Sequence, residues 1–364
     1  MNDDKIFTDI LEEFEKLTSH YNFVILVKLA IALLDENEFI QRDFLKNEKK
    51  YKEDIADLAK ELHNQYESTF KFYLKEIREQ SNKKINAAAS GIAFKELDKQ
   101  LLHKLNKSAY EGLNAFFEHI ENDYVVVNGE KIPVFDAYTR LIQRKSALGK
   151  GESANKIIKQ IVNEMLTNQI RVTNNEQNIR LDTCARRDLL DTFRNYQNDY
   201  RMTLGHQLGL DGVEITVHGN CAPDHVGIQG RKFSFADFDK LQNSLERPIS
   251  TLNCYHTFFP CMLKGPATYS AEQLDEIRRK SAETVEYTDA AGKLHRCTRY
   301  EGTQELRRQE TAMRRVDDRI KMLRSANMNV SKLQAVRQRQ LAHYCQTARS
   351  MGIPTSENRT RSYM

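Results

Sequence analysis

The sequence has no tryptophan and is poor in the residues that interrupt helices, with 15 glycines and 6 prolines among 364 residues. Because both residues destabilise the interior of a helix, their scarcity allows long helices. Six cysteines are too few to build a disulfide scaffold in a chain of this length. They suit a reducing compartment such as a bacterial cytoplasm.

The sequence also lacks signals of targeting, membrane insertion and nucleotide binding. Residues Met1 to Asp4 have none of the basic character that begins a signal peptide. The apolar run from Phe23 to Leu34 is short for a membrane span and contains Lys28, so we expect a buried helix there. Lys150-Gly151 lies outside any Gly-x-x-x-x-Gly-Lys-Ser/Thr pattern, which argues against a nucleotide site.

The charge of the chain is small but unevenly distributed. The net charge of +4 does not by itself indicate a nucleic-acid-binding protein. Residues 271–364 contain 19 Lys and Arg against 12 Asp and Glu, so the rest of the chain is close to neutral. A basic end on a near-neutral body indicates either a polyanion near that end or a solvated, Arg-rich helix.

Hydrophobic periodicity predicts the fold class. Apolar residues recur at helical spacing through the first 120 residues, and Ser153 is expected to cap a helix over 154–168. Asn128-Gly129 and Ala291-Gly292 each lie between strand-like stretches and predict hairpins. The sequence therefore predicts an α+β protein that is predominantly α-helical. We expect long N-terminal helices over 1–122, a small α+β domain over 123–266 and Arg-rich helices over 267–364.

One segment concentrates the less common residue types. It reads VEITVH from Val213, APDH from Ala222, IQGRKF from Ile228 and NCYH from Asn253, and Pro260 follows. This order resembles the phage minor capsid protein family that accompanies portal proteins in siphovirus-type genomes, and more distantly the Mu-type minor head proteins. The residues that carry the resemblance are Glu214, His218, Pro223, His225, Gln229, Gly230, Cys254 and His256.

The resemblance extends over roughly residues 150–364. Tyr269 to Leu274, Tyr300 to Gln304 before an Arg-rich stretch, and Asn358 to Thr360 are similar to further family segments. Tyr255 and Ala222 depart from the pattern, since arginine is commoner at the first position and occurs in some members at the second. Both departures remove a basic residue, which puts an anion-binding role of this loop in doubt.

The resemblance implies a structural virion protein with no enzymatic activity and no cofactor. It would lie inside the phage head near the portal vertex and act in head assembly, DNA packaging or DNA delivery. The implied partners are the portal protein, the major capsid or scaffold protein and, non-specifically, packaged double-stranded DNA; no membrane is implied. The protein would be made in the bacterial host cytoplasm.

The histidines and cysteine of the segment raise the question of a metal. His218, His225, Cys254 and His256 are residue types that bind Zn²⁺, but their spacing has no Cys-x-x-Cys pair. We expect the strand 213–217 to pair with the strand after Leu252, which would bring the four side chains together. Hydrogen bonds are the favoured explanation for such a cluster, and a zinc site is the less favoured alternative.

A virion-carried metal-dependent enzyme remains the alternative function, with an ADP-ribosyltransferase-like effector as one version. Glu214 and His218 would lie about 13 Å apart on one strand, too far to act as a pair without other segments. Ser250-Thr251 fits part of the transferase pattern, but no Glu-x-Glu follows it.

Arginines on the predicted helix over 302–324 are the candidate DNA contacts. They fall on one broad band and would bind phosphates without reading sequence. Acidic residues such as Asp317 and Glu305 lie among them, so intrahelical ion pairs compete for the same side chains. The six candidates are Arg307, Arg308, Arg314, Arg315, Arg319 and Arg324.

Overall fold

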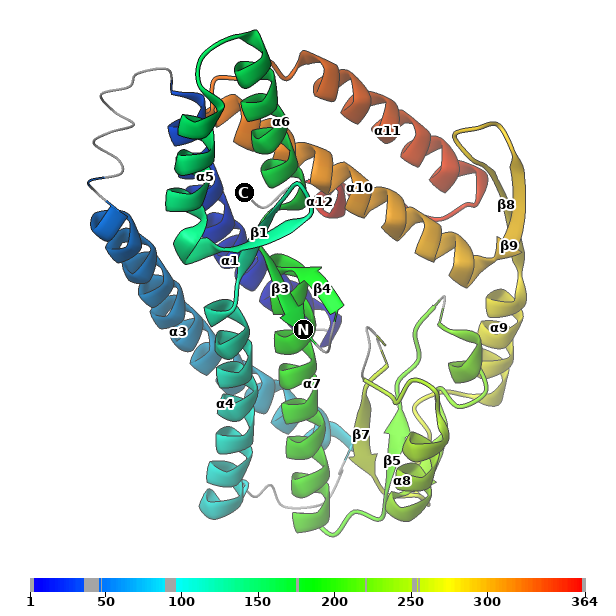
Figure 1. Ribbon diagram of the computed structural model, residues 1–364. Coiled ribbons are helices and arrows are strands. Elements are labelled where there is room, and N and C mark those ends of the chain that lie inside the picture. Colours follow the sequence, from blue (N-terminus) through cyan, green and yellow to red (C-terminus); the bar gives the residue numbers. More distant parts are fainter. Residues whose placement is uncertain are drawn as a thin grey trace.

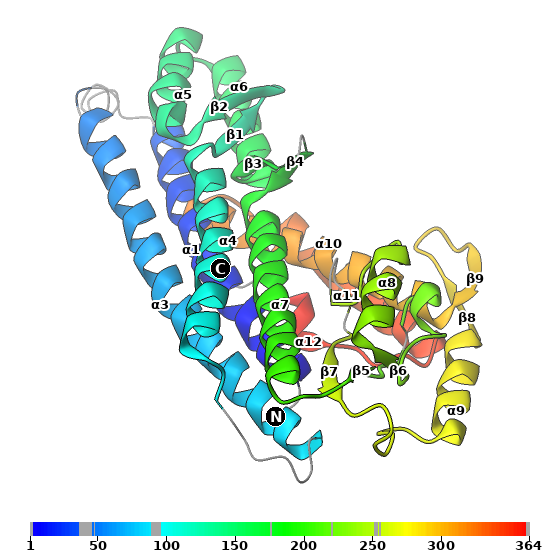
Figure 2. The same ribbon diagram turned by 90° about the horizontal axis from the view of Figure 1, so that it is seen from below.

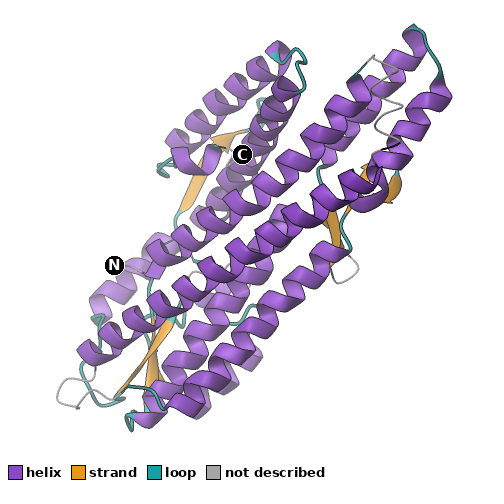
Figure 3. Cartoon of the chain, turned by 90° about the vertical axis from the view of Figure 1, so that its left-hand side faces the viewer, coloured by secondary structure: helices purple, strands orange, loops and turns teal. Residues whose placement is uncertain are grey.

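A computed structural model describes residues 3–35, 46, 48–88, 96–174, 177–219, 221–250, 254 and 256–361. Helices dominate and strands are short, as Figure 3 shows. The fold is α+β and predominantly α-helical, which confirms the predicted class. Asn253 and Tyr255, two positions of the sequence motif, lie outside the described residues.

Four long helices form the body of the molecule (Figures 1 and 2): α1 (Asp3–Leu34), α3 (Glu48–Ala88), α4 (Lys99–Glu121) and α7 (Leu181–Gln207). Helix α1 packs on α3 and α7, and α4 packs on α7. Their apolar stripes meet in an aromatic centre, where Phe193 lies 5.7 Å from Phe14 and 4.6 Å from Phe70 between ring centroids. The apolar residues that recur at helical spacing in the N-terminal region therefore form the core of the protein.

Helix α1 is also apolar enough to be compared with a membrane span. Residues Lys5–Leu34 pass that test by length and composition, and 56% of the most apolar window is buried inside the protein. Ile25, Leu26 and Leu29 of this helix belong to the main core. The run from Phe23 to Leu34 is thus part of a buried helix, as expected from the sequence.

A four-stranded sheet in the order β2-β1-β3-β4 covers one end of the body, and α5 and α6 flank it. Asn128 and Gly129 both have positive φ, which produces the predicted hairpin. The expected cap at Ser153 is wrong, because α6 begins at Glu152, two residues before the expected start, and Gly151 is its N-cap. The bounds are β1 (Tyr124–Val127), β2 (Glu130–Pro133), α5 (Val134–Leu148), α6 (Glu152–Asn168), β3 (Arg171–Asn174) and β4 (Gln177–Arg180).

A second, three-stranded sheet follows α7 and lies apart from the first, beside α8 (Figure 1). Its order is β6-β5-β7, and both pairings are antiparallel. A 3-10 turn, η1, separates the first two strands. The bounds are β5 (Gly212–Ile215), η1 (Pro223–His225), β6 (Lys232–Ser234), α8 (Phe235–Ser244) and β7 (Phe258–Cys261).

The C-terminal part returns across the body as helices. Helix α10 packs on α11, α1 and α6, so it is enclosed on several sides. Thr298 caps α10 in a capping box with Glu301, and Ser270 does the same for α9 with Gln273. The bounds are α9 (Ala271–Ala282), β8 (Thr284–Thr288), β9 (Leu294–Thr298), α10 (Arg299–Ser325), α11 (Ser331–Ser350) and α12 (Glu357–Thr360).

The apolar clusters divide the chain differently from the three predicted regions. The main cluster runs from the N-terminal helices through the first sheet to α7, and it also takes in Met322 and Leu323 of α10. The expected boundary at 122/123 therefore passes through one continuous core. The second sheet has its own cluster, which includes Val213, Ile215 and Phe258.

Candidate functional site: a histidine and cysteine cluster beside an arginine-lined cleft

Strand pairing brings the motif residues together. Strand β5 runs antiparallel to β7, with Gly212 opposite Cys261 and Ile215 opposite Phe258. The residues that follow β5 and those that precede β7 therefore lie at the same end of the sheet. His218 follows β5, while Cys254 and His256 precede β7, so the expected pairing and clustering are both confirmed.

The third histidine, His225, lies in the turn between β5 and β6. Pro223 begins η1, where its fixed φ and missing N–H are tolerated. His225 ends the turn and is 2% exposed. Its backbone carbonyl accepts hydrogen bonds from the amides of Ile228 and Gln229, both at 3.2 Å.

Four side chains meet at this end of the sheet. The Sγ atom of Cys254 lies 3.4 Å from Nδ1 of His225 and 3.4 Å from Nδ1 of His256. The His218 ring packs against the His256 ring, with 4.0 Å between centroids. The ligand-type atoms of His225, Cys254 and His256 all lie within 4.8 Å of one another. The four side chains thus form a compact group in space, as the sequence predicts.

Gln229 fixes the orientation of one ring. Its side-chain oxygen accepts a hydrogen bond from the backbone amide of His218 at 3.3 Å and lies 3.0 Å from Nε2 of His256. Because an amide N–H can only donate, the oxygen of Gln229 must face His218. Nε2 of His256 must then carry the hydrogen, which leaves its Nδ1 as a lone pair directed at Cys254.

The second ring is fixed in the same way. Nε2 of His225 lies 2.7 Å from the carbonyl oxygen of Arg247 and therefore donates to it. The Arg247 side chain donates to Asp224 at 2.7 Å and to the hydroxyl of Tyr300 at 2.9 Å. These contacts attach the cluster to the start of α10.

The cluster shifts the pKa values of its members. Burial, together with His218 and His225, lowers the pKa of His256 to about 2, so this ring is neutral at ordinary pH. Burial lowers the pKa of His225, but Cys254, the Arg247 carbonyl and Asp224 together raise it above its usual value. Burial raises the pKa of the Cys254 thiol, but the contact with His225 and backbone hydrogen bonds from Ser250 and His256 together lower it below its usual value.

Two other motif residues, Glu214 and Gly230, contact the segments around the cluster. Glu214 is 2% exposed and accepts a hydrogen bond from the amide of Thr268 at 2.9 Å, so it points away from the cluster. Gly230 has a φ of +71°, and a Cβ there would lie 2.3 Å from Leu274 and 3.0 Å from Val217. Glycine is therefore required here for two reasons, the positive φ and the close approach of these side chains.

A cleft of about 820 Å³ opens beside the cluster. Helix α1 and helix α7 form one wall, α10 forms another, and His218, His225, Cys254 and His256 lie on the wall supplied by the second sheet. Seven arginines and three glutamates line it, which makes it basic. The arginines are Arg186, Arg187, Arg194, Arg247, Arg307, Arg314 and Arg359.

The six candidate DNA-binding arginines do not form one surface. Arg314 lies 3.3 Å from Glu15 of α1, and Arg319 donates to Asn163 of α6 at 2.9 Å. Arg307 lines the cleft. Only three of the six are exposed, namely Arg308, Arg315 and Arg324, and Arg308 also pairs with Glu305 at 2.8 Å. Contact with DNA stays a prediction, and these three exposed arginines are the best candidates for it.

The basic cleft could not be predicted from the sequence. Glu15 is buried between Arg186 of α7 and Arg314 of α10, and burial raises its pKa against the effect of both arginines. These residues come from three distant helices, and no local spacing marks them. The one available signal was the pair Arg186 and Arg187, two adjacent arginines in a stretch with apolar residues at helical spacing.

A second group of ligand-type residues lies between α4 and α7. It consists of His119, Cys184 and Asp188. The Asp188 carboxylate lies 3.1 Å from Nδ1 of His119 and accepts the thiol hydrogen of Cys184 at 3.1 Å. One carboxylate thus serves both donors, and hydrogen bonds account for this group.

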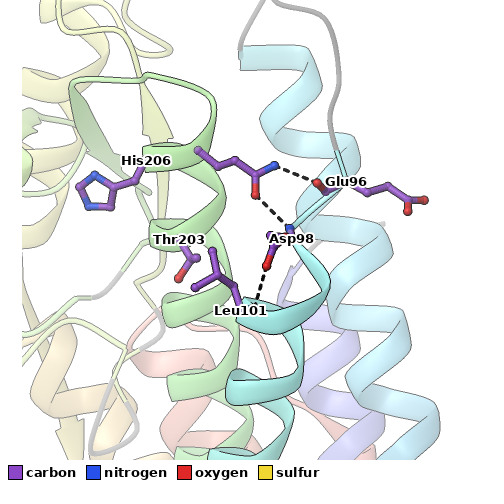
Figure 4. Close-up of a pocket in the computed structure, with 6 residues that line it drawn as sticks. Glu96, Asp98, Leu101, Thr203 and His206 are labelled. Atoms are coloured by element: carbon purple, nitrogen blue, oxygen red, sulfur yellow. Dashed lines mark hydrogen bonds between the residues drawn. The ribbon is translucent and has the colours of Figure 1, made fainter.

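A hollow of about 770 Å³ lies between the start of α4 and the end of α7, with Glu96, Asp98, Leu101, Thr203 and His206 around it (Figure 4). Its hydrogen bonds secure helix ends. Asp98 accepts from the amides of Gln100 and Leu101, and Gln207 bridges the backbone of Glu96 and Asp98. These contacts attach the segment before α4 to the end of α7.

No family model, curated protein or solved structure matches the chain.

Proposed function

We propose that this chain is a structural minor capsid protein of a tailed bacteriophage, resident in the virion at the head interior or portal vertex. Its partners would be the portal protein and the major capsid or scaffold protein. It would act in head assembly, DNA packaging or DNA delivery. It would be synthesised in the cytoplasm of the bacterial host, and it would have no catalytic activity of its own.

The observation that carries the proposal is the ordered motif between Val213 and Pro260. Its residues are spread over more than forty positions, yet His218, His225, Gln229, Cys254 and His256 contact one another directly or through one shared atom. A motif whose members hold one another in this way defines a small folded unit. That is the expected behaviour of a structural signature.

Packaged DNA would be a non-specific partner of this protein. The C-terminal region is basic, and Arg308, Arg315 and Arg324 present charge to solvent on α10. Contacts between such side chains and phosphates depend on charge and not on base sequence.

Mass spectrometry of purified particles tests the proposal. Particles produced by a host that carries this gene should contain peptides from the chain at low copy number relative to the major capsid protein. Particles with full heads and no such peptides would contradict it.

One observation favours a second candidate, a metal-dependent enzyme carried in the virion. His225, Cys254 and His256 lie on the wall of a basic cleft, where the ligands of a catalytic metal would be expected. The ADP-ribosyltransferase-like version lacks support, because the Ser250 hydroxyl donates to the carbonyl of His256 at 2.7 Å and no Glu-x-Glu follows in sequence. Nuclease and transferase assays on metal-loaded protein separate the two candidates, since only the enzyme gives turnover.

A further inference from the structure

The hydrogen bonds of the cluster leave a surplus of lone pairs at its centre. Nε2 of His225 and Nε2 of His256 both donate to oxygen atoms, so both Nδ1 atoms are acceptors directed at Cys254. The thiol has one hydrogen and can serve one Nδ1 only. Transfer of that hydrogen to His225 still leaves Nδ1 of His256 without a donor, because this atom would then face a thiolate.

A metal ion removes this imbalance. Zn²⁺ bound by two imidazole nitrogens and one thiolate has ligand atoms that are about 3.6 Å apart from nitrogen to sulfur in tetrahedral geometry. The two observed distances from Cys254 Sγ are both 3.4 Å. Histidine ligands of metals also donate their second ring N–H to a carbonyl or carboxylate, as both rings do here.

We propose that Nδ1 of His225, Sγ of Cys254 and Nδ1 of His256 bind one Zn²⁺ ion. This goes beyond the proposed place in the virion, and it departs from the expectation of hydrogen bonds that the sequence supports. The second group, with His119 and Cys184, is not a site, because Asp188 already accepts from both of them.

The fourth coordination position would face the cleft, because all three ligand residues line it. The three ligands and His218 all line it, opposite arginines such as Arg186, Arg307 and Arg314. A water molecule or an oxygen of an anionic group, such as a phosphate, fits an open position on a metal at a basic wall. Three protein ligands with one open position are the arrangement of zinc sites that exchange a ligand, in contrast to closed structural sites.

Cobalt substitution tests the site in the full-length protein. Chelator-stripped protein titrated with Co²⁺ should bind one equivalent and develop tetrahedral d–d bands and a thiolate-to-cobalt charge-transfer band. Cys254→Ser should lose the charge-transfer band, while Cys184→Ser, the control in the second group, should keep it. Added inorganic phosphate should alter the d–d bands if the fourth position is open to anions, and unchanged bands would indicate a closed site.

Two results would overturn the proposal. One is wild-type protein that takes up no Co²⁺ or Zn²⁺ at concentrations that saturate ordinary zinc proteins. The other is a charge-transfer band that Cys184→Ser removes. If Cys254→Ser fails to fold by circular dichroism, the wild-type titration and Cys184→Ser still decide the question. Gln229→Leu, which keeps all three ligands, should weaken metal binding about 10- to 100-fold by releasing the His256 ring.

Discussion

The guanidinium of Arg201 in α7 donates a hydrogen bond from Nη1 to the carbonyl oxygen of Phe258 in β7, 3.0 Å away. Nε of the same side chain donates to the hydroxyl of Ser81 in α3 at 3.2 Å. Arg201 is fully buried, so this one residue joins two helices of the body to the strand that leads into the cluster. This contact adds to the packing of β7 on α7 and α3, which positions the second sheet on the body.

Replacement of Arg201 should therefore destabilise the protein. Arg201→Met keeps much of the volume but leaves the Phe258 carbonyl without this donor, which should cost about 2–3 kcal/mol in the free energy of unfolding. Arg187→Met on the exposed side of the same helix should stay within about 0.5 kcal/mol of wild type. Urea unfolding monitored by circular dichroism gives both values. Equal stability of the two variants would show that Arg201 does not hold the sheet.

Gly230→Ala should be more costly than an alanine at another left-handed glycine. At Gly230 the new Cβ adds steric overlap with Leu274 and Val217 to the backbone strain, whereas Gly129 has positive φ and open space around it. We expect about 1 kcal/mol for Gly129→Ala and about 2–4 kcal/mol for Gly230→Ala. Thermal and urea unfolding of both variants measure the difference. A Gly230→Ala variant as stable as Gly129→Ala would mean that Leu274 moves aside without cost.

A buried carboxyl group should make stability fall as the pH rises. Burial raises the pKa of Asp123 to about 7, although the Tyr21 hydroxyl donates to it at 3.0 Å. In the unfolded chain this carboxyl titrates near about 4. Between these values the folded state holds a proton that the unfolded state has lost, so its contribution is complete below about pH 4 and is lost as the pH rises through about 7.

Asp123→Asn should remove this dependence. The amide resembles the protonated carboxyl group, so the variant should be more stable than wild type at pH about 8 and show a flatter profile between about 4 and 7. Tyr21 and Tyr51 face the carboxyl, and burial raises the pKa of each, so neither titrates in this window. Unfolding free energies measured across the window test the effect. Parallel wild-type and variant profiles would contradict it.

Much of this fold could be predicted from the sequence because it depends on local periodicity. The hairpin at Asn128-Gly129 and the capped helix after Ser270 follow from turn and cap chemistry within a few residues. The pairing of β5 with β7 was also predictable, since both are apolar and extended. These features require no knowledge of distant contacts.

The chemistry of the site depends on contacts that no local pattern encodes. Glu15 and Arg314 are 299 positions apart and meet only because α10 packs on α1. The direction of the His225 and His256 rings is set by Arg247 and Gln229, through a backbone carbonyl and a side-chain amide. The sequence predicts that the four side chains lie close together. It does not predict where the lone pairs of the ring nitrogens point, because that depends on the side-chain positions.

Exposed arginines of α10 should account for any binding to duplex DNA. Replacing Arg308, Arg315 and Arg324 together by alanine should lower affinity and reduce the slope of log K against log salt by up to about 3, or about 0.9 for each phosphate that is no longer neutralised. A control with Lys49, Lys60 and Lys71 of α3 replaced by alanine removes the same charge from another surface. Salt titrations of the full-length proteins by fluorescence anisotropy give the slopes. Equal reductions in both triple variants, or no binding at low salt, would leave these arginines as solvated charges.

Imaging of purified phage particles would show whether this protein resides at the portal vertex. Particles from a phage that encodes this chain, and particles from the same phage with the gene deleted, would be reconstructed by electron cryomicroscopy without imposed icosahedral symmetry. We expect density inside the head at the portal vertex that is present in the first reconstruction and missing from the second. Identical density at that vertex in both, with no peptides of this chain in the particles, would contradict it.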